Sequence, residues 1–242
     1  AFEGCTAFVV DRPGTGLSER FDGVTDRGSL LHLADQFVDD VCTGLGVDNV
    51  DVIASSFGGF IALHSAATSP ERVGRMVQMA CPAMAPGQQV PPFMKMMSIG
   101  WFRRFTSLFP PNESIGDSIL RQIGHGASLD KGRLPQNFKD WYLDLQRYTD
   151  TMENDGDMIG TVLSWRGDDG SLTIPDELFA SVSAPTLYLW GEDDGFGGRD
   201  VAEHVVDLMP DAELEMIPES GHLPWLDFPD QIGERARAFL DG

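Results

Sequence analysis

The sequence predicts an α/β protein in which a mostly parallel sheet lies between layers of helices. Short apolar stretches, typical of buried strands, alternate with longer stretches whose apolar side chains recur at helical spacing. The loops that follow the apolar stretches are rich in Gly, Ser, Asp and His. Strands that are connected through helices lie parallel, so we expect these loops to meet at one edge of the sheet, where α/β proteins bind ligands.

Three strands and two helices are predicted in the first third of the chain. The strands are Thr6–Val10, Val50–Ile53 and Arg75–Ala80. The helix Leu30–Leu45 has apolar side chains at helical spacing and ends in glycines, which commonly terminate helices. A second helix, Phe60–Thr68, ends just before Pro70.

The same alternation returns at Pro185. The strands Thr186–Trp190 and Leu214–Ile217 flank a helix at Val201–Met209, and the helix Gln231–Leu240 closes the sequence.

Residues 83–182 interrupt the alternation, and we expect them to form a helical lid inserted into a core made of residues 1–82 and 183–242. Pro, Gly and Met are frequent there. The predicted helices are Phe93–Phe109, Ile115–Ile123, Phe138–Tyr148 and Met152–Arg166. The methionines and aromatic residues near its start either line a pliable apolar pocket or only pack the lid against the core; they are Met84, Met94, Met96, Met97, Trp101 and Phe102.

The charge of the chain argues against two classes of partner. With 38 acidic and 17 basic residues, the net charge of −21 would repel nucleic acid and anionic membranes. No apolar run is long enough to span a bilayer, and the first residues lack the features of a signal peptide. The three cysteines make no metal motif and no disulfide framework. We therefore expect a cytoplasmic protein without metal or cofactor, and the sequence leaves its oligomeric state open.

A serine at the junction between a strand and a helix is the candidate nucleophile. The segment Val50–Leu63 runs from a strand through Ser55 and Ser56 into an apolar helix, and a serine on such a turn exposes its hydroxyl. Large side chains two positions away would collide with the crossing backbone. Ser56 has Ala54 and Gly58 there, whereas Ser55 has Ile53 and Phe57, so we select Ser56.

A serine hydroxyl needs a base, and the base needs an acid to orient it. Among the five histidines, His222 alone follows a strand in a loop flanked by glycine. The others, in helices or in the predicted lid, are expected to be surface or packed side chains; they are His32, His64, His125 and His204. The loop after Trp190 offers Glu192, Asp193 and Asp194, of which we select Asp194 and keep Asp193 in reserve.

The order Ser56, Asp194, His222 resembles that of the α/β-hydrolase superfamily, and the likeness covers almost the whole chain. The matching motifs are Asp11–Ser18, Ala54–Gly59, Leu189–Asp194, and Gly221-His222 with Pro229. The resemblance implies that Ser56 attacks an acyl carbon, that His222 transfers the proton and that Asp194 orients the imidazole. It also implies that the backbone N–H of Phe57 is an oxyanion donor.

One part of the family pattern is missing from the sequence. The family's second oxyanion donor comes from a loop after an earlier strand, usually marked by a His-Gly pair. No His-Gly pair precedes Asp11, where only Phe2–Val10 remain, and the His125-Gly126 pair lies in the predicted lid. We therefore expect that the sequence begins at the family's fourth strand, without the N-terminal strands; the expected activity is that of the parent protein, and the fragment itself could be inactive. Loss of one oxyanion donor typically costs about 3 kcal/mol of transition-state stabilisation.

The resemblance leaves several activities open. The first is a serine hydrolase that cleaves a carboxylic ester or similar bond of a small apolar acyl substrate. A carbon–carbon bond hydrolase acting on ring-cleavage products, a lactonase and a proline-iminopeptidase-like enzyme are alternatives; the last would use lid acids such as Glu153 and Asp155 to hold an amine. A non-catalytic ligand-binding member is a further alternative. The serine at position 56 argues against dehalogenases and epoxide hydrolases, which use a carboxylate nucleophile.

Overall fold

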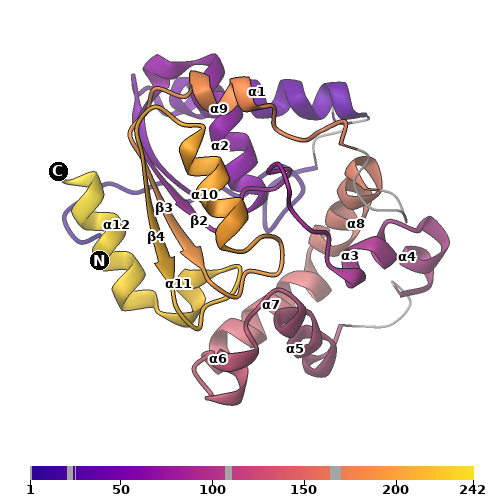
Figure 1. Cartoon of the computed structure of the whole chain (residues 1–242). Coiled ribbons are helices and arrows are strands. Elements are labelled where there is room, and N and C mark those ends of the chain that lie inside the picture. The colour runs from indigo at the N-terminus through magenta and orange to yellow at the C-terminus, as the bar shows by residue number, and fades with distance from the viewer. Residues whose placement is uncertain (1, 21–23, 25, 107–110, 164–169) are drawn as a thin grey trace.

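A four-stranded parallel sheet forms the centre of the computed structural model, which describes residues 2–20, 24, 26–106, 111–163 and 170–242 (Figure 1). The strands lie in the order β1-β2-β3-β4. Their bounds are β1 Val50–Ala54, β2 Val73–Met79, β3 Thr186–Gly191 and β4 Ala212–Ile217. Neighbouring strands are parallel throughout, as predicted.

Helices cover both faces of this sheet, and β3 shows how the sequence produces this arrangement. Tyr188 and Trp190 pack into one cluster, Leu187 and Leu189 into another, because successive side chains of a strand point to opposite faces. The first cluster is shared with α1 (Arg27–Leu45), α2 (Phe57–Thr68), α9 (Asp176–Ser181) and α10 (Arg199–Asp207). The second is shared with α12 (Pro229–Leu240), which follows the short α11 (Pro224–Asp227). Every residue of β3 is buried, as expected for a strand covered on both sides.

The ends of α1 follow from local sequence signals. The Asp26 carboxylate accepts the N–H of Ser29, and the Ser29 hydroxyl accepts the N–H of Asp26, which forms a reciprocal cap. At the other end Gly46 has φ 68°, a left-handed conformation that suits glycine. The predicted helix is confirmed and begins one turn earlier than its apolar pattern. A short 3-10 turn, η1 (Pro70–Arg72), follows α2.

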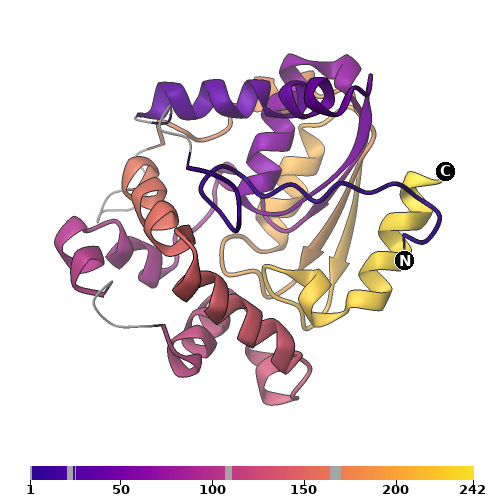
Figure 2. The same cartoon turned by 180° about the vertical axis from the view of Figure 1, so that it is seen from behind.

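The predicted strand Thr6–Val10 is wrong. These residues are exposed, with Val9 at 96% and Phe8 at 52%, and none of them joins the described sheet. A strand needs a neighbouring chain to bond its N–H and C=O groups, and β1 is paired only with β2. The segment therefore runs as an irregular trace that begins beside α12 (Figure 2), where Phe2 packs against the second cluster.

Helices fill most of the interruption in the alternation. They are α3 (Pro92–Met97), α4 (Gly100–Thr106), α5 (Glu113–Gln122), α6 (Gly126–Asp130), α7 (Gln136–Tyr148) and α8 (Thr151–Val162). The single helix predicted at Phe93–Phe109 is divided into α3 and α4, and the short α6, α9 and α11 were not predicted. Predicted helical residues 107–109 and 164–166 lie outside the described residues. Both views place α3–α8 together, at the end of the sheet toward which the strand arrows point (Figures 1 and 2).

Candidate active site

Ser56 lies on a strained turn between β1 and α2. Its φ of 54° and ψ of −116° are unusual for a residue with a side chain, and such strain is typically retained at functional sites. The Ser56 carbonyl accepts the N–H of Ala83, which ties this turn to the loop after β2. Phe57 is the first residue of α2, so its N–H has no acceptor within the helix. An anion at this position would also be favoured by the helix dipole.

Contrary to the prediction, no crossing backbone requires a small residue two positions after Ser56. A Cβ added to Gly58 would meet nothing within 4 Å, so no crossing backbone restricts that position. Gly59 is the restricted glycine, because a Cβ there would run into the side chain of Gln78 and come within 3.5 Å of the Pro82 Cα. Close packing of α2 on β2 therefore explains the second glycine of the motif.

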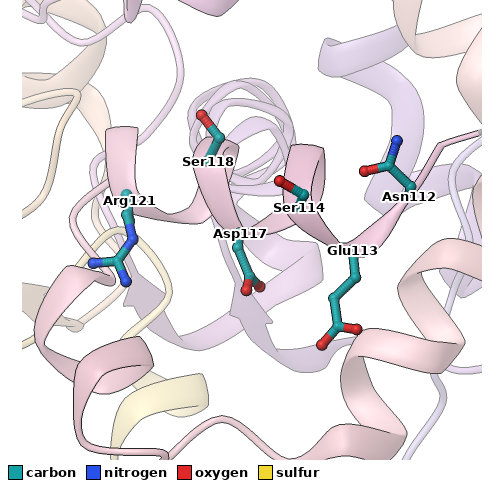
Figure 3. Close-up of a pocket in the computed structure, with 6 residues that line it drawn as sticks. All are labelled: Asn112, Glu113, Ser114, Asp117, Ser118 and Arg121. Carbon is teal, nitrogen blue, oxygen red and sulfur yellow. The ribbon is translucent and has the colours of Figure 1, made fainter.

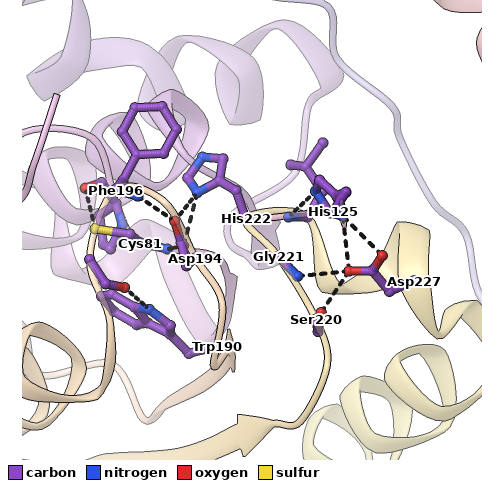
Figure 4. A network of polar contacts seen from close by, with 12 residues as sticks. Cys81, His125, Trp190, Asp194, Phe196, Ser220, Gly221, His222 and Asp227 are labelled. Carbon is purple, nitrogen blue, oxygen red and sulfur yellow. Dashed lines mark hydrogen bonds and ion pairs between the residues drawn. The ribbon is translucent and has the colours of Figure 1, made fainter. Parts of the chain in front are cut away.

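His222 and Asp194 form a buried pair at the carboxyl ends of β4 and β3 (Figure 4). The Nδ1 atom of His222 lies 3.0 and 2.9 Å from the two carboxylate oxygens of Asp194. The same carboxylate accepts the backbone N–H groups of Cys81 and Phe196, at 3.0 and 2.9 Å. With four contacts, the acid is fixed in place, and it holds the imidazole in one orientation.

The other ring nitrogen of His222 is free to act. Nε2 is buried and, among the described residues, has no hydrogen-bond partner. His222 and Ser56 line the same cavity of about 240 Å³, although no hydrogen bond joins them in the described part of the chain. The ring of Phe196 lies 4.3 Å from that of His222, centroid to centroid, and covers it. The structure therefore brings Ser56, Asp194 and His222 to one site, with the serine–histidine bond not formed.

The remainder of this cavity is mainly apolar and is built largely by α3, α8 and the loop after β2. The apolar lining includes Met84, Val90, Met94, Met158, Ile159 and Val162. Met84 and Met94 were candidates for such a lining, whereas Met96 and Trp101 are 46% and 72% exposed. Neither these two nor Met97 and Phe102 line the cavity.

Two polar features of the cavity were not predicted. Arg12, from the turn after the N-terminal segment, forms an ion pair with Asp155 of α8 and lies over the ring of Phe57. The Asp11–Ser18 motif was a signal for a turn, but nothing in it predicted a partner more than a hundred residues away. The second feature is the buried Cys81. Burial, assisted by the nearby Asp194 charge, raises the pKa of its thiol well above the ordinary value, so Cys81 stays protonated and is no competing nucleophile.

The remaining histidines are not at the cavity. His32 and His204 are exposed. His64, on α2, bonds Asp35 of α1 through Nδ1 at 2.9 Å. His125 is fully buried and bonds Asp227, an interaction that was not predicted.

A larger hollow of about 690 Å³ lies beside α5, away from these residues (Figure 3). Its lining is polar, and its acids already have partners: Glu113 and Asp117 both form ion pairs with Lys139. Arg121 is likewise paired, with Asp130. This hollow contains none of the candidate catalytic side chains.

The described residues contain neither a candidate metal site nor a candidate membrane-spanning helix. In the described ranges, no three or more His, Cys, Asp or Glu side chains are grouped so that they could hold a metal ion. Nor does any described helix combine the length and apolar character that crossing a bilayer requires.

Comparisons with known proteins place the chain in a family. The model of the alpha/beta hydrolase family matches residues 1–235. A 2-hydroxy-6-oxononadienedioate/2-hydroxy-6-oxononatrienedioate hydrolase of Burkholderia vietnamiensis is 27% identical over 239 residues, which cover 98% of this chain and 77% of the relative.

Two solved structures share the fold. The 2-hydroxy-6-oxo-6-phenylhexa-2,4-dienoate hydrolase of Rhodococcus sp. strain RHA1 superposes with a TM-score of 0.73 at 17% identity, covering 96% of this chain and 78% of that one. A carboxylesterase of Bacillus subtilis superposes with a TM-score of 0.69 at 20% identity, covering 95% and 72%. On the match of its sequence to the family model, the chain belongs to the alpha/beta hydrolase family.

Proposed function

We propose that this protein is a serine hydrolase in which Ser56, His222 and Asp194 form the catalytic triad. The observation that carries the proposal is the buried His222: Asp194 holds its Nδ1, its Nε2 has no hydrogen-bond partner among the described residues, and His222 lines the same cavity as Ser56. His222 takes the hydroxyl proton as Ser56 Oγ attacks a carbonyl carbon, and Asp194 stabilises the resulting imidazolium. The N–H of Phe57 supports the oxyanion.

The preferred substrate class is a ring-cleavage product that is cleaved at a carbon–carbon bond beside a carbonyl. The names of the curated relatives favour this over the ester cleavage first expected from the sequence. After Ser56 attacks, the bond between the carbonyl carbon and its neighbour breaks, and the departing carbon keeps the electron pair. His222 returns the proton to that carbon, and water then hydrolyses the acyl-enzyme. Such a substrate needs conjugation that delocalises the electron pair.

Ester cleavage is the second candidate, because a carboxylesterase shares the fold. The same triad serves both reactions, since an ester differs only in having an oxygen as the leaving atom. The aminopeptidase alternative is less well supported. The acids suggested for holding an amine, Glu153 and Asp155, are paired with Arg20 and Arg12.

We also propose that the helices α3–α8 act as a lid over the site; α9, at the end of the segment 83–182 expected to form the lid, packs on the sheet with α2 instead. Support comes from α3 and α8, which supply Met94, Met158, Ile159 and Val162 to the cavity wall. An apolar wall excludes water from the acyl-enzyme until the first product, the protonated leaving group, has left. The ion pair between Arg12 and Asp155 links the lid to the core at the cavity.

The test uses a fluorophosphonate probe and two substrates, 2-hydroxy-6-oxononadienedioate and a p-nitrophenyl ester. We expect the probe to label the protein and Ser56→Ala to abolish labelling and turnover. Ser55→Ala is the matched control, because Ser55 is the neighbouring serine and its buried Oγ has no partner among the described residues. This variant should keep probe labelling and turnover within about threefold of the wild type. Labelling that persists in Ser56→Ala would overturn the proposed nucleophile. A higher kcat/KM for the ester would reverse the order of the two substrate classes.

A further inference from the structure

A second buried histidine–carboxylate pair lies directly behind the loop that carries His222 (Figure 4). The Nδ1 atom of His125 is 2.9 Å from both carboxylate oxygens of Asp227, and both side chains are completely buried. His125 lies between α5 and α6 of the inserted helices, whereas Asp227 ends α11 after the His222 loop. The pair therefore joins the insertion to the core.

The second ring nitrogen of His125 defines its protonation pattern. Nε2 accepts the backbone N–H of Leu223 at 3.1 Å, so this nitrogen carries no proton. Nδ1 is then the protonated nitrogen and donates to Asp227. Unlike His222, His125 has no nitrogen left for proton transfer.

Three successive backbone N–H groups of the loop are held from the same side. Gly221 donates to Asp227 at 2.9 Å. His222 itself donates to the carbonyl of Ile123 at 2.8 Å, and Leu223 donates to His125. The Ser220 hydroxyl adds a fourth bond, to Asp227, at 2.8 Å. The backbone of the catalytic loop is thus bonded at the residue before His222, at His222 and at the residue after it.

The backbones at Gly124 and Gly221 lie so close together that neither position has room for a side chain. A Cβ added to Gly221 would lie 2.6 Å from the carbonyl carbon of Gly124, a separation that real structures avoid. Gly124 itself has φ 100° and packs against the Asp193 carbonyl. A buried polar network whose groups are hydrogen-bonded specifies one arrangement of the groups around it. The arrangement specified here is the position of the His222 imidazole.

We propose that His125 and Asp227 are positioning residues, which fix the catalytic histidine by holding the backbone of residues 220–223. This inference rests on the proposed role of His222 as the base. It assigns to the inserted helices a part in catalysis other than covering the substrate. The loop position controls how far Nε2 lies from Ser56 Oγ, and small displacements of catalytic groups lower kcat by about 10- to 100-fold.

Three variants of His125 separate its bond to Asp227 from its bond to the Leu223 N–H: His125→Asn, His125→Gln and His125→Leu. An asparagine amide can replace Nδ1 as the donor to Asp227, and a glutamine carbonyl can replace Nε2 as the acceptor from Leu223. Leucine replaces neither. We expect kcat to fall about 10- to 100-fold in His125→Leu, with partial recovery in the two amide variants and KM within about twofold throughout.

The matched control is His64→Leu, which removes a histidine that also bonds a carboxylate but lies between α1 and α2. It should change kcat by no more than about twofold. An unchanged kcat in a folded His125→Leu, or an equal loss in His64→Leu, would overturn the proposal. If His125→Leu does not fold, His125→Asn and His125→Gln still decide the matter, because a wild-type kcat in both would also overturn it.

Two further measurements separate this inference from the proposed function. Histidine ¹⁵N chemical shifts should show Nε2 of His125 unprotonated, and amide exchange at residues 221 and 223 should accelerate at least about tenfold in His125→Leu. A wild type that shows no turnover and no labelling would remove the proposed function, whatever these two readouts show. Unchanged amide exchange in an enzyme that is otherwise active would remove the positioning role alone.

Discussion

Two buried histidine–aspartate pairs, His222–Asp194 and His125–Asp227, lie close together in this protein and have similar bond lengths, but the second ring nitrogen of each histidine has a different environment. His222–Asp194 and His125–Asp227 both join Nδ1 to a buried carboxylate at about 3 Å. His222 lines the cavity and its Nε2 lacks a partner within the described chain, whereas the Nε2 of His125 accepts a backbone N–H. Whether each histidine can transfer a proton therefore depends on whether its Nε2 is already hydrogen-bonded, not on the carboxylate at its Nδ1.

The two carboxylates differ in the backbone groups whose N–H bonds they accept. Asp194 accepts the N–H of Phe196 in its own loop and the N–H of Cys81 just after β2, and so ties the loop after β3 to the neighbouring strand of the sheet. Asp227 accepts groups of the loop that it follows, Ser220 and Gly221, and so belongs to the loop. One acid orients an imidazole, and the other orients the backbone from which that imidazole extends.

The largest expected effect comes from removing the His222 imidazole, whose Nε2 has no hydrogen-bond partner among the described residues. His222→Gln should lower kcat by on the order of 10⁵-fold or more, because it removes the base and leaves Ser56 unactivated. His64→Gln also breaks a histidine–aspartate pair, but away from the cavity, and should leave kcat within about twofold. Steady-state kinetics and fluorophosphonate labelling measure both. Similar losses in the two variants would show that any buried histidine–aspartate pair matters equally and would end the comparison.

Local signals explain why most of the core could be predicted. The order of strands and helices, the strand–serine–helix turn and the position of His222 after a strand all depend on residues that are close in sequence. The convergence of strand ends at one edge then placed Ser56, Asp194 and His222 near each other without any knowledge of contacts. The roles of these three residues stay a proposal.

The features that could not be predicted depend on distant partners. Thr6–Val10 has a strand-like composition but pairs with no strand of the described sheet, and composition carries no information about neighbours. His125 was predicted only to be a surface or packed side chain. Its partner Asp227 is 102 residues away, and no periodicity links them. Gly58 was assigned a steric role that belongs to Gly59, because only the packing of α2 on β2 distinguishes two adjacent glycines.

Asp227→Asn should give the next largest effect, this time on stability. An asparagine offers one acceptor oxygen in place of two, so a buried donor among His125, Ser220 and Gly221 loses its acceptor, which typically costs about 1–3 kcal/mol of unfolding free energy. Burial alone would raise the pKa of Asp227, but the hydrogen bond from His125 and the N–H of Gly221 outweigh it, so the pKa lies below the ordinary value. The group therefore stabilises the fold fully above the ordinary carboxylate pKa, near 4, and loses that contribution as the pH falls through the lower folded value.

Urea unfolding between pH 7 and pH 3 measures this effect. The difference between wild type and Asp227→Asn should be largest at neutral pH and should shrink below about pH 4. The matched control is Asp35→Asn, since the side chain of Asp35 is 37% exposed and its pair with His64 is hydrated. A difference that stays constant with pH would show that Asp227 acts through packing and not as a charged acceptor.

Glu219→Gln should have the smallest effect, although it lies in the same loop as His222. Its carboxylate bonds Lys131 and Arg133 at 2.6 and 2.7 Å, which again connects the insertion with the loop. The Glu219 side chain is 53% exposed, so water screens both pairs, and we expect only a slight loss of stability that disappears in roughly 1 M salt. Because the buried bonds at residues 221–223 remain, kcat should stay within about twofold. Glu192→Gln, which breaks the exposed pair with Arg199, is the control. A tenfold loss of kcat in Glu219→Gln alone would mean that the exposed ion pairs, and not the buried pair behind them, hold the catalytic loop.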